Sequence, residues 1–323
     1  MTRSAVVVIP TLNEERRIGA LLDQLIRLPA ALVPEILVTD GRSTDATRAI
    51  VADRAARDPR IRLIDNAARL QAAGINLAVA EARTDADTIV RIDAHATYPD
   101  DFVPQVMARF ATTGADMVAV RLDTRGESCL QRGIAAAMNS RLGTGGSAHR
   151  VGGFSGFVDH GHHAGMDRAM FRRVGGYDPT FPANEDAELD YRIRRAGGRI
   201  WLAGEIEVGY FPRRTLGALF TQYRRYGEGR ARTFLKHGER LRLRQMLPPA
   251  VSFGIVAALL LSLLSPFFLI VPVGYAAALL GAAAGMAVRA RSLCMIAAAP
   301  AMAVMHLAWG LGFTTTVPKR RYR

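Results

Sequence analysis

A long uncharged stretch in the C-terminal part of the chain limits what it can fold into more than any other feature. Residues 248–288 form a run of about forty residues whose only ionisable group is Tyr275, and one bilayer crossing needs roughly twenty apolar residues. Two arginines end this run, and the apolar run over 293–317 that follows holds no acidic or basic residue except His306. Core helices of a soluble protein are the alternative. We expect two or three apolar segments that attach the chain to a membrane.

A belt of basic residues precedes the apolar stretch. Between 213 and 244 it consists of Arg213, Arg214, Arg224, Arg225, Arg230, Arg232, Lys236, Arg240, Arg242 and Arg244. Such belts are typical of the cytoplasmic side of a membrane and attract anionic lipid headgroups. The net charge of +13 comes almost entirely from arginine, which makes it weak support for nucleic-acid binding. We therefore expect membrane lipids as partners and no nucleic acid. A further basic tail at 319–323 leaves the number of crossings open, and nothing in the sequence indicates an oligomeric state.

The N-terminal segment lacks the pattern of a cleavable signal. The apolar run Ala5–Ile9 is too short, and the polar residues after it break it at once. We expect residues 1–240 to form a cytoplasmic domain and residues 241–323 to attach it to the inner (plasma) membrane. Two cysteines, Cys129 and Cys294, fit a reducing compartment, so neither a disulfide framework nor a zinc site is expected.

Residues before the basic belt alternate between strand-like and helix-like patterns. Short apolar runs rich in β-branched residues occur at 5–9, 35–39, 61–64, 88–92 and 116–120. Helical spacing of apolar residues follows several of these runs. This alternation predicts an α/β fold with a mostly parallel, Rossmann-like sheet flanked by helices.

Short segments that contain polar side chains follow three of the predicted strands. They are Thr11, Asn13 and Glu14 after the first strand, Asp40, Gly41 and Ser43 after the second, and Asp93, Ala94 and His95 after the fourth. Ligands of such sheets bind beyond the carboxyl ends of the strands, so we expect these side chains at one rim. No glycine-rich dinucleotide or P-loop motif accompanies them. The pattern favours a nucleotide that is held by side chains, with or without a metal ion.

A cluster of carboxylates lies between Asn184 and Glu188. Asn184 is a candidate helix N-cap, which places Glu185 and Asp186 in the first helical turn. Acidic residues at this position also interact favourably with the helix dipole, so a purely structural role is the alternative. We consider Asp186 the first candidate for chemistry.

Five segments in this order resemble one known family. They are VVVIPTLNEERRIGALLDQL, ILVTDGRSTDATRAIV, VRIDAHATYPDD, GGYDPTFPANEDAELDYRIRRAGGRIWL and QYRRYGEGR. Together they resemble the GT-A glycosyltransferases of family 2, and in particular the membrane-attached, succinoglycan-type glucosyltransferases of bacterial exopolysaccharide synthesis. The resemblance covers residues 4–235 and implies a GT-A fold followed by C-terminal transmembrane helices.

The resemblance also implies where a UDP-sugar binds. Residues after the first two strands would hold the nucleoside, and these are Thr11, Asn13, Glu14 and Asp40. Arg69 matches a basic position near the base or the diphosphate, although a solvated loop arginine is the alternative. The family's metal motif has two aspartates separated by one residue, where this chain has Asp93-Ala94-His95.

A divalent metal is therefore expected as cofactor, with Asp93 and His95 as ligands. Mg²⁺ or Mn²⁺ would neutralise the charge on the leaving diphosphate, and a histidine ligand suits Mn²⁺ better than Mg²⁺. In the alternative, Asp93 binds the ribose and His95 alone contacts the ion.

The remaining positions concern the acceptor. Asp186 matches the family's general base, which takes the proton of the acceptor hydroxyl during an inverting transfer, and Glu185 would orient it. Gln222, Arg225 and Tyr226 stand where related synthases carry a Gln-x-x-Arg-Trp motif that closes over the diphosphate and the acceptor. The alternative for these three residues is an amphipathic helix beside the membrane.

The expected function is inverting transfer of a sugar, glucose from UDP-glucose, to a lipid-linked saccharide at the cytoplasmic face. Within enzymes, a polyprenyl-phosphate glycosyltransferase or a processive polysaccharide synthase is the alternative. A membrane-tethered nucleotide-sugar binding protein is the non-enzymatic alternative. His160, His162 and His163 are expected to form a substrate-facing loop, since no cysteine or acidic pair completes a zinc site around them. This function requires that Asp40, Asp93 and Asp186 line one crevice.

Overall fold

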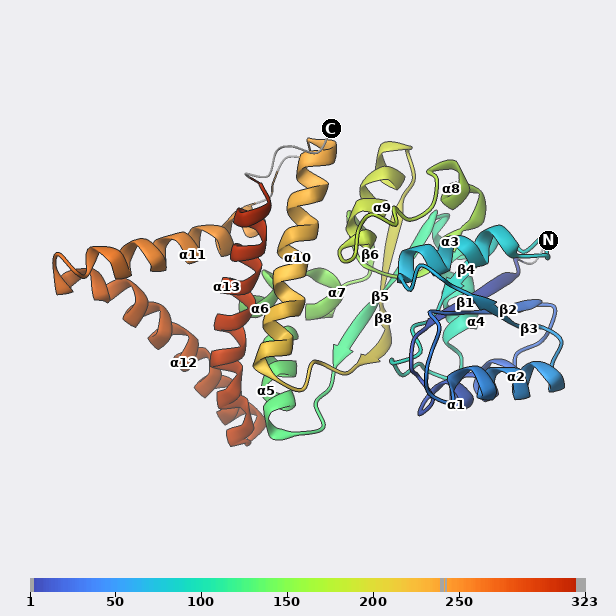
Figure 1. Ribbon diagram of the computed structural model, residues 1–323, viewed down its shortest axis with the longest axis horizontal. Coiled ribbons are helices and arrows are strands. Elements are labelled where there is room, and N and C mark those ends of the chain that lie inside the picture. The colour runs from blue at the N-terminus through green and yellow to red at the C-terminus, as the bar shows by residue number, and fades with distance from the viewer. Residues whose placement is uncertain (1–2, 239–240, 242, 318–323) are drawn as a thin grey trace. The chain divides into compact units, whose positions relative to one another are not determined.

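The computed structural model describes residues 3–238, 241 and 243–317, and packing divides the chain into two compact units. The sheet unit comprises Met1–Leu122 and Gly152–Tyr210, and the helical unit comprises Asp123–Val151 and Phe211–Arg323. Figure 1 shows the elements of both units along the chain. The expected end of the catalytic domain at residue 240 stays a prediction, because packing groups the residues differently.

One eight-stranded sheet, in the order β3-β2-β1-β4-β7-β5-β8-β6, organises the sheet unit. Its strands are β1 (Ala5–Thr11), β2 (Glu35–Asp40), β3 (Ile61–Asp65), β4 (Thr88–Arg91), β5 (Met117–Thr124), β6 (Gly156–Val158), β7 (His162–Asp167) and β8 (Ile200–Tyr210). The first four strands pair in parallel, which confirms the expected α/β fold class with its GT-A-like sheet. β7 was not foreseen as a strand, and it pairs antiparallel with both β4 and β5.

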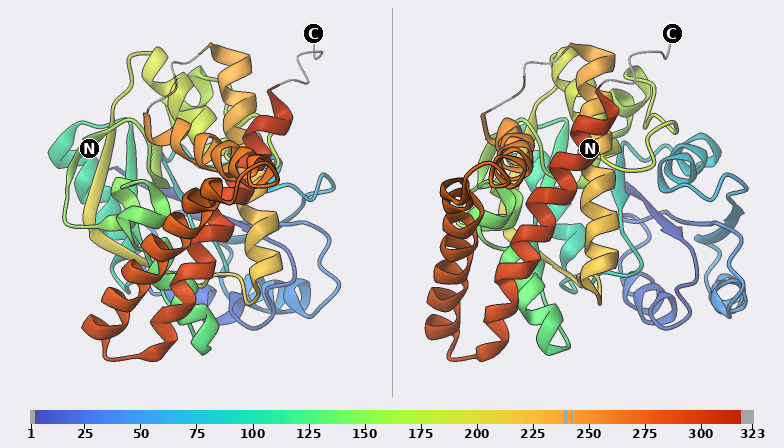
Figure 2. Two further views of the ribbon diagram at one scale, coloured as in Figure 1. Left: turned by 90° about the vertical axis from the view of Figure 1, so that its left-hand side faces the viewer. Right: turned by 60° about the vertical axis from the view of Figure 1, so that its left-hand side comes forward.

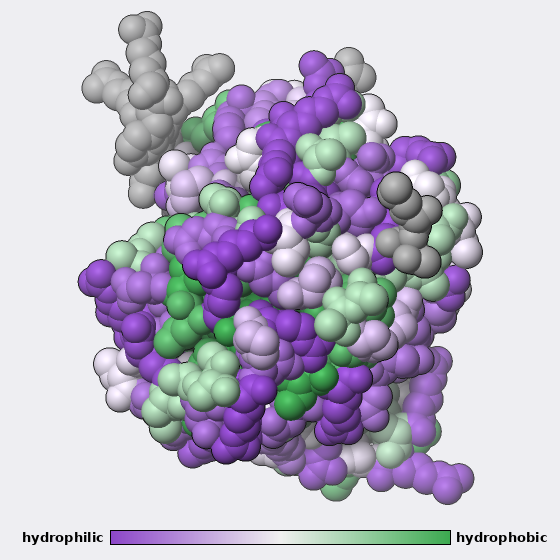
Figure 3. All heavy atoms as spheres, turned by 90° about the vertical axis from the view of Figure 1, so that its right-hand side faces the viewer, coloured by the Kyte–Doolittle hydropathy of each residue, from purple (hydrophilic) through white to green (hydrophobic). Residues whose placement is uncertain are grey.

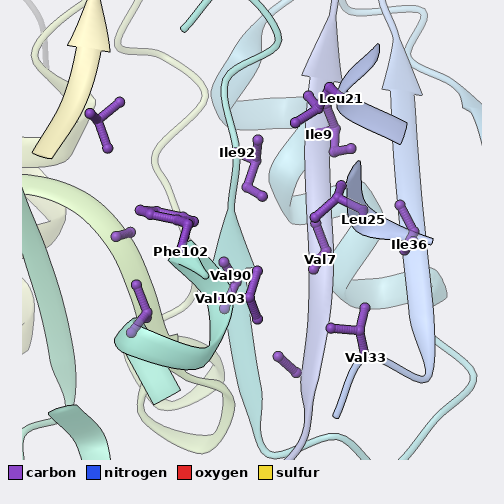
Figure 4. Close-up of a cluster of buried hydrophobic side chains, with 14 of the residues drawn as sticks. Val7, Ile9, Leu21, Leu25, Val33, Ile36, Val90, Ile92, Phe102 and Val103 are labelled. Atoms are coloured by element: carbon purple, nitrogen blue, oxygen red, sulfur yellow. The ribbon is translucent and has the colours of Figure 1, made fainter. Parts of the chain in front are cut away.

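Helices on both sides of the strands complete the core of the sheet unit. They are α1 (Ile18–Leu25), α2 (Thr47–Arg57), α3 (Gln71–Glu81), α4 (Phe102–Thr113), α8 (Arg168–Arg173) and α9 (Glu185–Arg195). Figure 4 shows Leu21 and Leu25 of α1 beside the apolar side chains of β1 and β2, and Phe102 of α4 near β4. Full burial of each such side chain stabilises the fold by about 1.5–3 kcal/mol. The face of the molecule in Figure 3 is mostly hydrophilic, as expected when apolar side chains point inward.

The helical unit contains the apolar segments. Its elements are α5 (Cys129–Met138), α6 (Arg141–Thr144), α7 (Ala148–Val151), α10 (Leu216–His237), α11 (Leu243–Leu261), the 3₁₀ turn η1 (Pro266–Leu269), α12 (Ile270–Ala290), the 3₁₀ turn η2 (Leu293–Ala297) and α13 (Ala298–Thr316). In Figures 1 and 2, α13 runs alongside α10, while α11 and α12 form a hairpin.

Two segments of the helical unit, Pro266–Ala290 and Leu293–Thr316, are long and apolar enough to be candidate membrane spans. Gln245–Leu261 is a shorter apolar helix. Large apolar side chains on the hairpin are exposed, among them Phe253, Leu264 and Phe267. Arg240, Arg242 and the basic tail at 319–323 lie outside the described residues.

Glycines set the distance between α10 and α13. A Cβ atom at Gly227 of α10 would lie 2.0 Å from the carbonyl oxygen of Trp309 in α13. A Cβ atom at Gly312 of α13 would lie 2.0 Å from the carbonyl oxygen of Arg224 in α10. Small residues allow helix backbones to approach closely in this way. The two helices therefore have no room for a side chain at either glycine.

We predict that Gly227→Ala destabilises the protein. The added methyl group meets backbone rather than a flexible side chain, and overpacking of this kind costs about 1–3 kcal/mol. Thermal unfolding of the detergent-solubilised protein measures the effect. The matched control is Gly217→Ala in the same helix, where a Cβ atom meets nothing within 4 Å. Equal unfolding midpoints for the two variants would contradict the close approach.

A disulfide joins Cys129 at the start of α5 to Cys294 in η2. The expectation of unpaired cysteines is therefore wrong. The two cysteines are 165 residues apart in sequence, so their spacing gave no sign of the packing that brings them together. That packing is tight, because a Cβ atom at Gly133 of α5 would lie 2.5 Å from the Cβ atom of Ala297.

Candidate active site

A buried arginine connects the end of β4 with the start of α9. Arg91, the last residue of β4, is 4% exposed. Its Nη1 atom donates to Asp186 Oδ1 at 2.7 Å. Its Nε and Nη2 atoms donate to the two carboxylate oxygens of Asp93 at 3.0 and 3.2 Å. Two of the three predicted site carboxylates thus share one guanidinium group. Sequence analysis missed Arg91, although a charged residue inside the apolar run 88–92 was a signal.

Arg91 also determines the charge state of both carboxylates. Burial by itself raises the pKa of Asp93, but Arg91 lowers it, and the net pKa is about 2. For Asp186, burial again acts upward, while Arg91 and then His163 hold the pKa well below its usual value. Both groups are consequently ionised at neutral pH.

Histidines of β7 and of the loop before it form a series of contacts that ends at Asp186. His163 is buried, with Nδ1 2.6 Å from the Tyr177 hydroxyl and 3.4 Å from Asp186 Oδ1, and Nε2 2.9 Å from Asp190 Oδ1. His160 Nδ1 lies 2.6 Å from the other Asp190 oxygen. The expectation of a histidine loop is wrong for His162 and His163, since both belong to β7. The run His162–Asp167 lacks the alternation of apolar residues that identifies a strand.

The start of α9 matches the expected position. Asn184 is the N-cap residue with a left-handed backbone (φ 66°), but its side chain makes no capping hydrogen bond. Glu185 and Asp186 occupy the first turn. Burial first, and then the charge of Asp186, raise the pKa of Glu185 to about 7. The pKa values of these two adjacent carboxylates therefore lie on opposite sides of the ordinary range, and of the two only Asp186 bonds to Arg91.

We predict that Glu185→Gln stabilises the protein at high pH only. The folded-state pKa of about 7 lies above the ordinary 4.5, so ionisation of Glu185 costs stability as pH rises from 4.5 to 7. Glutamine removes this cost, a gain of at most about 3 kcal/mol above pH 7 and none below pH 4.5. Unfolding midpoints at pH 8 and pH 4.5 measure it. Glu188→Gln is the control, because it breaks a buried ion pair with Arg192 and is expected to lower the midpoint at pH 8. A gain for Glu185→Gln at both pH values would contradict the prediction.

The ends of β1 and β2 form the predicted donor side. The Thr11 hydroxyl is buried and has no hydrogen-bond partner among the described residues. Asn13 has a left-handed backbone (φ 57°), and its Oδ1 atom accepts from the Thr44 N–H at 2.9 Å. The Glu14 N–H donates to Thr47 Oγ1 at 2.8 Å. These bonds fix the loop after β1 against the loop after β2.

Asp40 is completely buried at the end of β2. Its Oδ2 atom accepts from the Ser43 N–H at 2.9 Å and from Arg48 Nη1 at 2.9 Å, and its Oδ1 atom accepts from the Ser43 hydroxyl. The carboxylate therefore shapes its own loop. Arg69, predicted near the base or diphosphate, is exposed in the loop between β3 and α3 and has a left-handed backbone (φ 56°).

The donor set for a metal ion is small. His95 is half exposed, and its Nδ1 atom lies 3.7 Å from Glu14 Oε1. Asp93 already accepts from Arg91 and from Gln71 Nε2. Within the described part of the chain, no three histidine, cysteine or acidic side chains come together as a metal site. The assignment of Asp93 and His95 as metal ligands stays a prediction, and an ion held by so few side chains would take its other ligands from phosphates and water.

The predicted acceptor residues of α10 form a group in the helical unit. Gln222 is buried, and its Nε2 atom donates to the Tyr226 hydroxyl at 2.9 Å, one helical turn away. The rings of Tyr223 and Tyr226 meet edge to face, with centroids 5.4 Å apart. Arg225 is exposed.

The family follows from a match to residues 6–175 by the profile described as Glycosyl transferase family 2. The chain belongs to glycosyltransferase family 2. The succinoglycan biosynthesis protein ExoA of Rhizobium meliloti (strain 1021) is 47% identical over 314 residues, which are 96% of this chain and 94% of that protein. The resemblance drawn from the five ordered segments is thereby confirmed, and the chain is a glycosyltransferase.

Solved structures show the same fold as this family 2 chain. The mannosyltransferase PcManGT from Pyrobaculum calidifontis, in complex with GDP-Man and Mn²⁺, aligns with a TM-score of 0.58 and 20% identity over 95% of this chain and 88% of its own. Glucosyl-3-phosphoglycerate synthase from Mycobacterium tuberculosis aligns with a TM-score of 0.51 and 20% identity over 74% and 81%. At such low identity the likeness concerns the fold alone.

Proposed function

We propose that this protein is an inverting hexosyltransferase that moves glucose from UDP-glucose to a lipid-linked saccharide in exopolysaccharide or cell-envelope glycan synthesis. The observation that carries the proposal is Asp186, an ionised carboxylate that shares Arg91 with Asp93 at the end of β4. The identity to a succinoglycan biosynthesis protein supports a saccharide acceptor of this kind. The apolar helices support an acceptor in the membrane, and the basic belt before them supports a catalytic unit at its cytoplasmic face.

Asp186 has the role of general base. The acceptor hydroxyl attacks the anomeric carbon on the face opposite UDP, its proton passes to Asp186, and the bond from that carbon to the diphosphate oxygen breaks as the new C–O bond forms. The low pKa of Asp186 keeps it ionised but makes it a weak base. Proton transfer is therefore expected late, when the attacking oxygen has become acidic. The negative charge of Asp186 also stabilises the oxocarbenium-like sugar.

Donor binding is assigned to the residues around β1, β2 and the end of β4. The Thr11 hydroxyl has no hydrogen-bond partner among the described residues, so we assign it a hydrogen bond to the nucleotide. The other donor-site residues lie at or just after the ends of β1, β2 and β3, and they are Asn13, Glu14, Asp40 and Arg69. Asp93 and His95 would hold Mn²⁺ or Mg²⁺ together with the diphosphate. When bound, that ion neutralises the charge that develops on the leaving UDP.

Acceptor binding is assigned to Glu185 and to Gln222, Arg225 and Tyr226 of α10. The Gln222–Tyr226 hydrogen bond holds an aromatic ring in a fixed orientation, which suits stacking against a sugar. Arg225 and the other exposed arginines of the basic belt suit anionic lipid headgroups and a lipid diphosphate.

Sugar transfer into lipid tests the proposal. Membranes that contain the protein are incubated with a panel of radiolabelled nucleotide sugars, with Mn²⁺, with Mg²⁺ or with a chelator, and the lipid phase is extracted. The expected result is label from UDP-glucose in the lipid fraction, dependent on metal and lost in membranes that contain Asp186→Asn. If every donor leaves the lipid fraction unlabelled, the proposed acceptor is wrong.

A further inference from the structure

A chain of polar contacts leads to Asp186, and the proposed reaction assigns no role to its other members. It runs from His160 through Asp190 and His163 to Asp186, with successive separations of 2.6, 2.9 and 3.4 Å. His163 and Asp190 are 1% and 0% exposed, respectively. Burial of charged or polar groups is costly unless each has a partner.

We propose that His163 is a positioning residue for Asp186 and that Asp190, with His160, holds the His163 ring in its working orientation. The inference rests on the proposed function, in which Asp186 is the general base. Both Asp190 oxygens contact histidine rings, because Oδ2 lies beside His160 Nδ1 and Oδ1 lies beside His163 Nε2, the ring nitrogen that does not contact Asp186. The near side of His163 contacts Asp186 and the Tyr177 hydroxyl.

These contacts determine which oxygen of Asp186 meets the acceptor. Arg91 Nη1 and His163 Nδ1 both approach Oδ1, at 2.7 and 3.4 Å. The Tyr177 hydroxyl connects the two side chains, since it bonds to His163 Nδ1 and accepts from Arg91 Nη1 at 3.2 Å. The two contacts with Oδ1 restrict rotation of the Asp186 carboxylate, and we assign its other oxygen, Oδ2, to the acceptor hydroxyl. Orientation of a reacting group in this way lowers the barrier without a direct contact between His163 and substrate.

The charges around His163 favour its role as a cationic partner. Burial by itself lowers the pKa of His163, but Asp186 and Asp190 raise it, and the net pKa is above the usual value. The titratable groups that act on Asp186 come from several elements, and they are Arg91, His160, His162, His163, Tyr177 and Glu185. Arg91 and His163 each lie within 4 Å of its carboxylate.

The test replaces His163 by glutamine, which retains hydrogen bonding but cannot carry a positive charge. We expect kcat for transfer to fall about 10- to 100-fold, as for loss of other orienting partners, with KM for the nucleotide sugar nearly unchanged. The acidic limb of the kcat–pH profile moves to higher pH, because loss of a nearby cation raises the pKa of Asp186. Asp190→Asn is expected to give the same pattern in a weaker form.

A double variant separates positioning from a general structural effect. In the Asp186→Asn background, His163→Gln is expected to change the residual rate less than about twofold, because its effect acts through Asp186. Glu188→Gln is the matched control on α9, since it also breaks a buried ion pair but leaves the pH profile in place. Binding of UDP verifies that each variant is folded.

Two results would overturn the inference. One is a folded His163→Gln variant with wild-type kcat and pH profile, and the other is an equal loss of rate in both backgrounds. If His163→Gln does not bind UDP, the same measurements are made on Asp190→Asn and His160→Gln. Wild-type kcat in both of these variants would overturn the inference. Full transfer by Asp186→Asn would instead exclude Asp186 as the general base, which is the part of the proposed function on which this inference rests.

Discussion

Replacement of Asp186 by asparagine is expected to lower kcat for sugar transfer about 10²- to 10⁴-fold. Asparagine has nearly the same shape but cannot accept the proton of the acceptor hydroxyl. Binding of UDP is expected to persist, because Asp186 lies on the acceptor side of the proposed site. Initial rates of lipid labelling, together with UDP binding to the same preparation, measure the two effects.

The control for this variant is Asp53→Asn in α2. Asp53 is an exposed carboxylate that pairs with Arg54 and Arg57. Its replacement is expected to leave transfer unchanged. Near wild-type transfer by Asp186→Asn would exclude Asp186 as the base, and Glu185 would become the next carboxylate to test.

Replacement of Arg91 by methionine is expected to destabilise the protein by about 3–5 kcal/mol, because the buried Asp93 and the partly buried Asp186 then lose their shared cation. The loss depends on pH. With Arg91 present, the pKa of Asp93 is about 2 in the folded protein and 3.8 ordinarily. The ionised Asp93 therefore contributes its full share of folding stability above pH 3.8, and this share is lost as pH falls through 2. Without Arg91, burial raises both carboxylate pKa values, and protonation then relieves part of the loss at mildly acidic pH.

Unfolding midpoints at pH 7 and pH 5 test this prediction in detergent. The deficit of Arg91→Met is expected to be larger at pH 7. Arg57→Met is the control, because Arg57 is exposed and its pair with Asp53 contributes little. A deficit that is small, or that grows toward pH 5, would show that Arg91 does not neutralise the two carboxylates.

The parallel half of the sheet could be predicted from the sequence, and the antiparallel insertion could not. The runs before Thr11, Asp40 and Asp93 are apolar because parallel strands are buried on both faces. β7 begins with two histidines and contains a glycine, a composition typical of a loop. Its place between β4 and β5 depends on pairing between residues far apart in sequence, which local patterns do not record.

Candidate residues of the site could be chosen from the sequence, but their contacts could not be predicted. Position after a strand predicted that Asp40 and Asp93 lie at one edge of the sheet. The sequence could not show that the Asp40 carboxylate accepts hydrogen bonds from Ser43 and Arg48, or that Arg91 pairs with Asp93. The role of Arg91 depends on the approach of α9 to β4, and the sequence alone does not determine that contact.

The discontinuous composition of the two units has a consequence for synthesis. The chain passes from one unit to the other after Leu122, Val151 and Tyr210, and α5 must find η2 and α13 much later in translation. Cys129 precedes Cys294 by 165 residues, which at 5–20 residues per second corresponds to a delay on the order of ten seconds. During that interval the apolar face of α5, including Ile134 and Met138, lacks its native cover. A nascent α5 is therefore expected to rest on the bilayer surface or on a chaperone until the last helix emerges from the ribosome.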